Sequence, residues 1–368
     1  MNNPTIIVTG GHLTPAQAVI DVLQKKYPSW NIVWVGRKYA FEGTKTQSAE
    51  YENIVRLGIP FVSLTTGRLQ RKFSFYTIPS LLKIPVGIVQ SMLILKKYKP
   101  ALVVSFGGYI ALPVALAAYV LRIPVLTHEQ THHIGASNKI IGLVAKKICV
   151  TFPETLSEVP KEKGVLTGLP IRKEIFSPPA KPSFPMPNSR LALLYITGGS
   201  TGAQSLNDKL FPFIEKLLES WVVVHQTGEI SYKKALKTKE SVRHQERYII
   251  APFFQGEDVA WLLHHARVVI GRSGANTVAE LSAVGTPAVL VSLPWAGGNE
   301  QEQNARAYVQ TGNAVLLDQD SVSEENVMNT LHTLTKKLKH GQQHTQLPDA
   351  AHSVAEEIEI CLSYGREV

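Results

Sequence analysis

The stretch LALLYITGGSTGAQSLN, residues 191–207, is an apolar run that ends in Thr-Gly-Gly and continues into a segment of helical pattern. The same order occurs early in the chain, in TIIVTGGHLTPAQAV at residues 5–19. A strand followed by glycines and a helix builds an anion site, because glycine lets the backbone approach closely and the free N–H groups at the helix start face the anion. Two such stretches predict two similar α/β domains rather than one long sheet.

Short β-branched runs alternate with helical segments along the chain. The runs expected to be strands are Thr5–Val8, Asn31–Val35, Ala101–Ser105, Pro124–Thr127, Lys147–Thr151, Ala192–Thr197, Trp221–Gln226, Tyr248–Pro252, Val268–Ile270, Ala288–Ser292 and Ala314–Leu317. The alternation predicts parallel sheets with helices on both faces. Five prolines within residues 178–187 are typical of a connection, so the change of domain is expected between residues 160 and 190. A last helix is expected at about 349–364, with Asp349 as N-cap.

The bulk composition suits a soluble two-domain protein. The chain has 368 residues, of which 44% are hydrophobic, enough for two sizeable cores. Its two cysteines form no Cys-x-x-Cys, which argues against a disulfide framework or a zinc ribbon and suits a reducing cytosol. No signal peptide is expected, and the longest apolar stretches, 84–95 and 109–121, are shorter than the roughly 20 residues that span a bilayer.

The excess positive charge is confined to one segment. The net charge is +9, and residues 53–128 hold nine cations and no acidic residue. The same segment is rich in apolar side chains between Phe73 and Val89. Cations beside exposed apolar groups fit an anionic membrane surface. Two alternatives remain: a core flanked by solvated cations, and a nucleic-acid surface, for which no recognised motif is present.

Two motifs of the second half predict a nucleotide or nucleotide-sugar site. TGGSTGA, residues 197–203, is a glycine turn without the Lys of a Walker loop; the alternative is a tight turn only. GRSGANTVAE, residues 271–280, opens a second helix with the hydroxyls of Ser273 and Thr277. Glu280 can accept hydrogen bonds from both ribose hydroxyls. The alternative is a buried ion pair between Arg272 and Glu280.

HEQTHH, residues 128–133, matches the zinc pattern His-Glu-x-x-His, which requires a helix. Here the segment follows a strand, so it is expected to be a strand-to-helix connection whose side chains line a cleft at the carboxyl end of a parallel sheet. Its lining residues would be Glu129, His132 and His133. His12 follows Gly10 and Gly11 at the equivalent sheet edge. We favour a functional role for His12 over a purely structural one.

In order and spacing, these motifs resemble the N-acetylglucosaminyltransferases of peptidoglycan synthesis, in glycosyltransferase family 28. The matching segments are Gly-Gly-His followed by Pro15, FGGY at 106–109, IPVLTHEQ at 123–130, NK at 138–139, TGLPIR at 167–172, GGSTGAQSLN at 198–207, RSGANTVAEL at 272–281 and EQNA at 302–305. Each segment is weak alone, but together they cover nearly the whole chain.

The resemblance implies an α/β protein of GT-B fold, with two Rossmann-like domains, parallel sheets and a cleft between them. Residues 1–165 would bind the acceptor and the membrane, residues 166–345 would bind the UDP-sugar, and a C-terminal helix in residues 346–368 would pack back on the N-terminal domain. The implied reaction is inverting transfer of GlcNAc from UDP-GlcNAc to the lipid-linked diphosphate acceptor lipid I, giving lipid II. The protein would act as a peripheral protein on the cytoplasmic face of the cell membrane, docking through residues 67–99.

The resemblance also implies site residues. The donor would contact Arg172, Ser200, Phe254, Gly274, Ala275, Thr277, Glu280 and Gln301. The acceptor would contact Gly10, Gly11, Tyr109 and Asn138. His12 is the first choice for the base that takes the proton of the acceptor hydroxyl, and Glu129 is the second. The leaving diphosphate would be stabilised by helix N-termini and Arg172, so neither a metal nor another cofactor is expected.

Three positions depart from the family pattern. One Gly-Gly pair stands where the family usually has two, Thr131 stands where it has Asn, and Glu300 stands where it has Gln or His. Alternatives are a diacylglycerol glycosyltransferase of the same family, which would need no acceptor diphosphate site, and a UDP-GlcNAc 2-epimerase, which would need no basic apolar face. A non-catalytic subunit that presents a nucleotide-sugar is a third.

Overall fold

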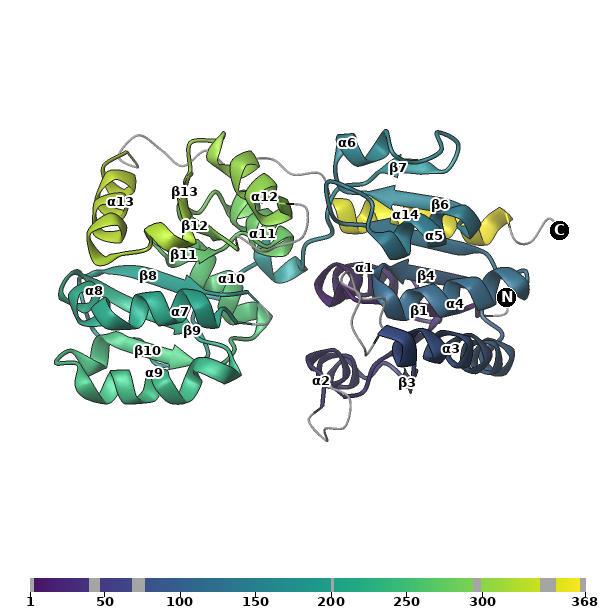
Figure 1. Ribbon diagram of the computed structural model, residues 1–368, viewed down its shortest axis with the longest axis horizontal. Coiled ribbons are helices and arrows are strands. Elements are labelled where there is room, and N and C mark those ends of the chain that lie inside the picture. Colours follow the sequence, from purple (N-terminus) through teal and green to yellow (C-terminus); the bar gives the residue numbers. More distant parts are fainter. Residues whose placement is uncertain are drawn as a thin grey trace. The chain divides into compact units, whose positions relative to one another are not determined.

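The β-branched runs pair as parallel strands in two separate sheets, each in its own unit (Figure 1). Unit 1 comprises residues 1–170 and 348–368, and unit 2 comprises residues 171–347. The computed structural model describes residues 3–39, 47–67, 77–199, 202–293, 299–337 and 349–364. The change of unit therefore falls at Pro170–Ile171.

The sheet of unit 1 has the strand order β3-β2-β1-β4-β5-β6-β7. Its strands are β1 (Thr5–Gly10), β2 (Asn31–Gly36), β3 (Phe61–Ser63), β4 (Leu102–Phe106), β5 (Val125–Glu129), β6 (Lys147–Val150) and β7 (Gly164–Leu166). All neighbours are parallel; Ile7, for example, lies between Val33 and Val103. The order runs outward from β1 in one direction and from β4 in the other.

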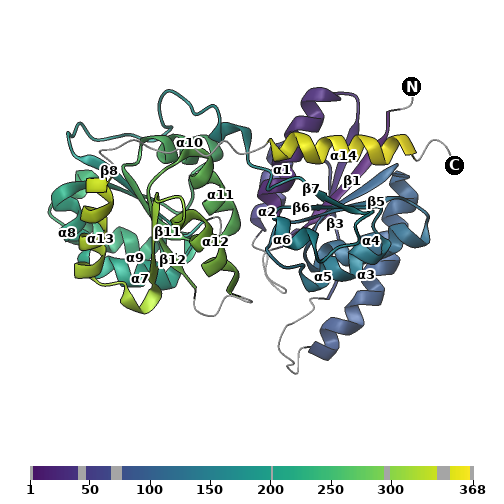
Figure 2. The ribbon, with the colours of Figure 1, turned by 90° about the horizontal axis from the view of Figure 1, so that it is seen from above.

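The helices of unit 1 cover both faces of this sheet. They are α1 (Leu13–Lys26), α2 (Ala49–Arg56), α3 (Thr77–Tyr98), α4 (Gly108–Val120), α5 (Ala136–Val144), α6 (Pro153–Leu156) and α14 (Ala350–Tyr364). Successive residues of a strand point to opposite faces. Ile7 accordingly joins one core, with α3, α4 and α5, while Ile6 and Val8 join the other, with α1 and α14. Figure 2 shows these two helix layers on either side of the strands.

Helix α14 is the last described element of the chain, yet it belongs to unit 1. It lies beside α1 (Figure 2), and Val354, Ile358 and Cys361 are buried in the core that α1 shares. An exposed ion pair joins Lys26 Nζ to Glu359 Oε1 at 2.7 Å. Because exposed pairs contribute little, the apolar contact holds the helix in place.

The sheet of unit 2 has the order β10-β9-β8-β11-β12-β13, again with parallel neighbours. Its strands are β8 (Ala192–Thr197), β9 (Trp221–Gln226), β10 (Tyr248–Ala251), β11 (Val268–Arg272), β12 (Ala288–Ser292) and β13 (Ala314–Asp318). Its α-helices are α7 (Gln204–Leu210), α8 (Ile214–Ser220), α9 (Glu229–Ser241), α10 (Gly256–His265), α11 (Ala275–Val284), α12 (Glu300–Val309) and α13 (Glu324–Lys337). The first six strands of unit 1 and the six of unit 2 thus follow the same Rossmann order, which confirms the predicted α/β class.

The proline-rich segment lies wholly within unit 2. The backbone N–H and the hydroxyl of Ser183 both donate to the carboxylate of Asp258, at 2.7 and 2.5 Å. Phe184 packs against Phe254, with ring centroids 4.8 Å apart. These contacts fasten the segment to α10 and to the loop before it.

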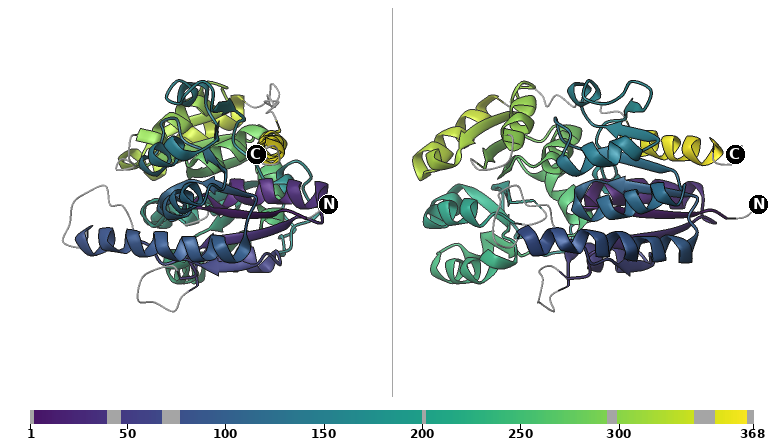
Figure 3. Two further views of the ribbon diagram at one scale, coloured as in Figure 1. Left: turned by 90° about the vertical axis from the view of Figure 1, so that its right-hand side faces the viewer. Right: turned by 45° about the vertical axis from the view of Figure 1, so that its right-hand side comes forward.

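The long helix α3 runs along the outside of unit 1 (Figure 3). It contains Pro85, and its last turn carries Lys96 and Lys97. Of the helices in the described part of the chain, none combines the length and apolarity needed to span a bilayer.

Candidate active site

Each sheet reverses its strand order at one place, between β1 and β4 in unit 1 and between β8 and β11 in unit 2. Open parallel sheets bind ligands outside the carboxyl ends of the strands at such a point. Both glycine turns predicted from the sequence lie there, after β1 and after β8. Each unit therefore has a candidate site of its own.

The floor of the unit 1 site consists of two glycine turns packed backbone to backbone. The Gly11 N–H donates to the Gly107 carbonyl at 2.9 Å. Gly10 has φ +149°, and a Cβ there would lie 2.7 Å from the Phe106 carbonyl carbon. Gly108 has φ +81°, and a Cβ there would lie 3.0 Å from the Gly11 nitrogen. Only glycine fits at these positions, so the turns after β1 and β4 fix each other.

His12 lies over this floor as the N-cap residue of α1, without a side-chain capping bond. A Cβ built on Gly107 would lie 3.4 Å from His12 Cδ2 and 3.1 Å from Asn138 Nδ2, so ring and amide flank the same glycine. Burial lowers the pKa of His12, and the charge of Glu129 opposes that shift. A neutral imidazole is what a general base requires.

Asn138 and Tyr109, both expected to bind the acceptor, differ in their surroundings. Asn138 is buried, and its side-chain amide is used within the unit: Nδ2 donates to the His128 carbonyl and to Glu129 Oε2, and Oδ1 accepts from the Thr127 hydroxyl at 3.0 Å. Tyr109 is half-buried in the first turn of α4, directly after Gly107 and Gly108. The Asn138 side chain is therefore used in hydrogen bonds within unit 1, whereas Tyr109 is still partly accessible to solvent.

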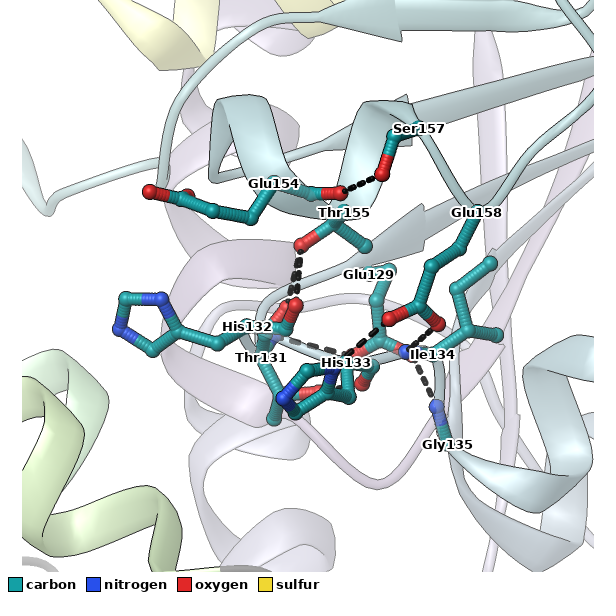
Figure 4. Close-up of polar contacts among 10 residues, drawn as sticks. All are labelled: Glu129, Thr131, His132, His133, Ile134, Gly135, Glu154, Thr155, Ser157 and Glu158. Carbon is teal, nitrogen blue, oxygen red and sulfur yellow. Dashed lines mark hydrogen bonds and ion pairs between the residues drawn. The ribbon is translucent and has the colours of Figure 1, made fainter.

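Residues 130–135 form the connection between β5 and α5, as predicted, and the strand itself extends to Glu129 (Figure 4). The Glu129 carboxylate accepts from the N–H groups of Thr131 and Gly135 and from Asn138 Nδ2, and the Thr131 hydroxyl lies 2.7 Å from its Oε1. The ring of His132 stacks on Phe152 with centroids 3.6 Å apart. His133 Nδ1 pairs with Glu158 Oε1 at 2.6 Å. The two histidines thus point to different neighbours instead of converging on one metal.

The unit 2 site begins at the glycine turn after β8. Gly199 and Gly202 both have φ +74°, and a Cβ on Gly198 would lie 2.2 Å from the Ala203 nitrogen. A Cβ on Gly199 would lie 3.4 Å from Thr277 Oγ1, so the turn and the start of α11 are adjacent. Ser200, expected to contact the diphosphate, lies outside the described residues.

The N-terminus of α11 offers the second half of this site. Gly274 is its N-cap residue, and a Cβ there would meet nothing within 4 Å. Ser273 is fully buried, and its hydroxyl has no partner within the described residues. Ala275, in the first turn, is buried. The N-cap residue makes no side-chain hydrogen bond to the N–H groups of that turn. Such a helix start attracts an anion.

Gln301 is placed at the start of α12, and its Oε1 accepts from the Leu293 N–H at 3.1 Å. Asn304, one turn further, donates to the Ser273 carbonyl at 3.2 Å. These two bonds tie α12 to the ends of β12 and β11. Gln301 is thereby held beside the helix start of the site.

Glu280 faces inward, as predicted, but its partner is Arg172. Glu280 is 4% exposed, and its Oε1 accepts from both Nε and NH2 of Arg172 at 2.7 Å. Burial raises the pKa of Glu280, and the guanidinium opposes the shift. Arg172, expected to contact the diphosphate, thus holds the carboxylate in place through Oε1.

The alternative in which Arg272 pairs with Glu280 is wrong. Arg272 donates to the carbonyls of Val291 and Ser292, to the Ser205 hydroxyl and to Gln319 Oε1. Burial lowers its pKa to about 10. It points away from the α11 start because three structural elements offer it oxygen acceptors on that side.

At the end of β13, residues 318–320 are Asp-Gln-Asp. Both aspartates are exposed, and the side chain of Gln319 accepts a hydrogen bond from Arg272. Within the described residues no three His, Cys, Asp or Glu side chains gather in a way that could hold a metal ion.

Phe254 lies in the loop between β10 and α10, where its backbone N–H donates to Gln226 Oε1 at 3.0 Å. The amide of Gln226 also donates to the Gly199 carbonyl at 2.9 Å. Gln226 therefore links the Phe254 loop to the glycine turn, a role that the sequence analysis missed. Its only signal was a polar residue at the carboxyl end of a buried strand.

Comparison with known proteins identifies both halves of the chain. Residues 5–150 match the model of the glycosyltransferase family 28 N-terminal domain, and residues 193–358 match that of the family 28 C-terminal domain. The UDP-N-acetylglucosamine--N-acetylmuramyl-(pentapeptide) pyrophosphoryl-undecaprenol N-acetylglucosamine transferase of Desulforudis audaxviator is 35% identical over 84% of this chain and 83% of its own length. The enzyme of the same name from Bacillus cytotoxicus is 31% identical over 95% of each chain.

Solved structures agree with the predicted fold. The crystal structure of Acinetobacter baumannii MurG is 27% identical, with a TM-score of 0.64 over 97% of this chain and 99% of that one. A UDP-GlcNAc 2-epimerase from Methanocaldococcus jannaschii has a TM-score of 0.63 over 98% of this chain and 99% of its own, at 12% identity, which shows a shared fold alone. The prediction of a GT-B fold is thereby confirmed. With both family models matched and relatives above 30% identity along most of its length, the chain belongs to glycosyltransferase family 28.

Proposed function

We propose that the protein transfers GlcNAc from UDP-GlcNAc to undecaprenyl-diphospho-N-acetylmuramyl-pentapeptide, lipid I, and so forms lipid II for peptidoglycan synthesis. The observation that carries this proposal is the identity of 31–35%, over 84–95% of the chain, with curated enzymes named for that reaction. The alternative epimerase activity is supported by fold likeness only, at 12–14% identity.

Unit 2 binds the donor in this proposal. The diphosphate lies between the glycine turn after β8 and the start of α11, where Gly274, Ala275 and Thr277 offer backbone N–H groups and a hydroxyl. The ribose hydroxyls donate to Oε2 of Glu280, whose other oxygen Arg172 holds. Uracil carries an N–H donor at N3, and the Phe254 carbonyl is the acceptor that we assign to it. Gln301 and Ser200 complete the contacts to sugar and phosphate.

Unit 1 supplies the acceptor side and the base. The acceptor diphosphate lies over the turn of Gly10 and Gly11, beside Tyr109. The acceptor hydroxyl attacks the anomeric carbon opposite UDP, so the configuration inverts, and His12 takes its proton through the imidazole that burial keeps neutral. The negative charge that develops on UDP is stabilised by the N–H groups of the helix start, which need no reorganisation.

We further propose that unit 1 docks on an anionic membrane at its cytoplasmic face. Helix α3 exposes 57% of Val86, 58% of Val89 and 64% of Leu93, and Lys96 and Lys97 follow. Apolar side chains beside cations bind anionic lipid interfaces. Residues 68–76, the start of the segment predicted from sequence to dock, lie outside the described residues.

The direct test is a transfer assay with radiolabelled UDP-GlcNAc and a short-chain lipid I analogue in detergent, with and without EDTA. We expect labelled lipid II in both conditions. Transfer of label to added diacylglycerol would support a diacylglycerol glycosyltransferase, and formation of UDP-ManNAc without any transfer would support an epimerase. Either result would contradict the proposal. Equal turnover with and without EDTA would support the absence of a metal requirement.

A His12→Gln variant separates chemistry from donor binding. We expect kcat to fall about 10²–10⁴-fold because the base is lost, while UDP affinity measured by calorimetry stays unchanged. His352→Gln, an exposed histidine of α14, is the matched control and should keep wild-type turnover. Unchanged turnover in the His12 variant would mean that another group takes the proton.

A further inference from the structure

The buried carboxylate of Glu129, at the carboxyl end of β5, accepts hydrogen bonds from three N–H donors of the segment that follows it, and Figure 4 shows its surroundings except for Asn138. Oε1 accepts from the Thr131 N–H at 3.0 Å, and the Thr131 hydroxyl lies 2.7 Å from Oε1 and 2.5 Å from the His133 carbonyl oxygen, which share its one proton. Oε2 accepts from the Gly135 N–H and from Asn138 Nδ2, each at 2.9 Å. Glu129 is 2% exposed, so these protein donors replace water at both oxygens.

We propose that Glu129 is a positioning residue: its carboxylate fixes the segment Thr131–Asn138 beside the Gly107 turn and His12, and it takes no proton from the acceptor. This inference rests on the proposed function, in which His12 is the base. It replaces the alternative assignment of Glu129 as that base.

The hydrogen-bond geometry favours this role. A base must offer a lone pair to the acceptor hydroxyl, whereas the carboxylate of Glu129 already accepts from three N–H donors, and the Thr131 hydroxyl lies 2.7 Å from its Oε1. Turning the carboxylate toward a substrate would strand the N–H groups of Thr131 and Gly135. A buried donor without a partner costs about 1–3 kcal/mol, so such a movement is disfavoured.

The position that Glu129 controls is the floor of the acceptor site. Asn138, which donates to Glu129 through Nδ2, lies 3.1 Å from the place where a Gly107 Cβ would stand. The His12 ring flanks the same glycine. Glu129 therefore positions Asn138 against the Gly107 turn, on which the Gly10–Gly11 turn of the proposed diphosphate site packs.

Thr131 contacts Glu129 through its side chain as well as its backbone, because its hydroxyl lies 2.7 Å from Oε1 and 2.5 Å from the His133 carbonyl oxygen. From the other side, the Thr155 hydroxyl donates to the carbonyls of Thr131 and His132 at 2.9 Å, and Glu158 Oε2 accepts from the Ile134 N–H at 3.1 Å. Glu129, Thr155 and Glu158 thus all form hydrogen bonds to the segment and hold it in place.

The charge of Glu129 also acts on His12. Glu129 raises the pKa that burial lowers, and the other titratable group that faces His12, the buried His128, is itself kept neutral by burial, which lowers its pKa to about 4. Removing the charge of Glu129 while keeping its shape should therefore move the His12 limb of the pH profile to lower pH. Removing a base would instead abolish the limb.

The test compares Glu129→Gln with Glu129→Ala in the lipid I assay, against wild type. Glutamine cannot act as a base but keeps half of the carboxylate's acceptor capacity and its size. We expect Glu129→Gln to keep kcat within about tenfold of wild type with its limb shifted to lower pH, and Glu129→Ala to raise the acceptor KM more than tenfold, since misplacement by about 1 Å can cost 10²-fold. Glu154→Gln is the control, because Figure 4 shows its carboxylate turned away from the segment.

Equal losses of about 10²–10⁴-fold in kcat for the Gln and Ala variants, with the pH limb gone, would overturn the proposal and make Glu129 the base. Amide hydrogen exchange gives a readout that does not depend on transfer. Glu129→Ala should speed exchange at Thr131 and Gly135 while Glu154→Gln should not. If wild type makes no lipid II, the proposed function fails, and unchanged exchange in Glu129→Ala would separately remove the positioning role.

Discussion

Glu280 is buried one turn into α11, and Arg172 reaches it from 108 positions earlier in the sequence. Its inward direction was predictable, because the glutamate stands among apolar residues after a glycine-opened helix start. Its partner was not predictable, because the choice between Arg172 and Arg272 depends on where β12, α7 and the 3-10 turn Gln319–Ser321 place the oxygen atoms that Arg272 meets. At the scale of one residue, sequence patterns identify the groups and the tertiary structure assigns their partners.

A Glu280→Gln variant tests this pair at the residue scale. We expect UDP to bind about 10–100-fold more weakly, because hydrogen bonds to a charged group contribute about 1.5–3 kcal/mol. Isothermal titration calorimetry measures the affinity. Glu240→Gln, on the exposed end of α9, is the matched control. An unchanged dissociation constant would show that the ribose does not contact Glu280.

At the scale of elements, three strands of the unit 2 sheet were predicted most accurately. The bounds of Ala192–Thr197, Trp221–Gln226 and Ala288–Ser292 agree with the structure at both ends. The edge strands Phe61–Ser63 and Gly164–Leu166 were missed. Each has three residues, pairs with one neighbour and has no fully buried residue, so it lacks the continuous apolar run that marks a strand buried on both faces.

Helix α2 carries a pH-dependent contact to β2. The Trp34 indole N–H donates to Glu50 Oε1 at 2.6 Å, and burial raises the pKa of Glu50 from 4.5 to about 7. A carboxyl group with a raised pKa holds more protons in the folded state, so its contribution to stability falls as the pH rises from about 4.5 to about 7.

Replacing Glu50 by Gln should remove this dependence while still accepting the indole N–H. We expect the free energy of unfolding at pH 8 to rise by about 1–2 kcal/mol, less than the pKa difference implies because Glu50 is only half-buried. At pH 4 the variant should match wild type. Urea unfolding at both values measures this, with the exposed Glu52→Gln as control; equal changes at both values would contradict the assignment.

At the scale of the molecule, two units with the same sheet order each have their own cores. The duplication was visible in the sequence as two strand–Gly-Gly–helix stretches, since the Rossmann order places a glycine turn at each reversal point. The membership of α14 in unit 1 was not a matter of local pattern, because its apolar face fits any sheet. Its packing on the N-terminal domain was predicted only from the family resemblance.

Calorimetry should therefore resolve two unfolding transitions that respond to different changes. UDP at about 100 times its dissociation constant should stabilise unit 2 by about 2.7 kcal/mol and leave unit 1 unchanged. Ile358→Ala should destabilise unit 1 by about 2–5 kcal/mol, whereas Ile360→Ala, 40% exposed, should have little effect. A single transition that shifts with both UDP and Ile358→Ala would show that the units unfold together.

The late position of α14 in the chain has a consequence for biosynthesis. Unit 2 is translated in full before α14, which shares a core with Val8 and Val104 on one face of the unit 1 sheet and with Val19 of α1. That face is apolar, and exposed apolar surface on a nascent chain invites chaperones and aggregation. The first unit to be translated is thus the last to be completed, and a chain truncated before residue 350 would expose part of the apolar core of unit 1 although it contains all of unit 2.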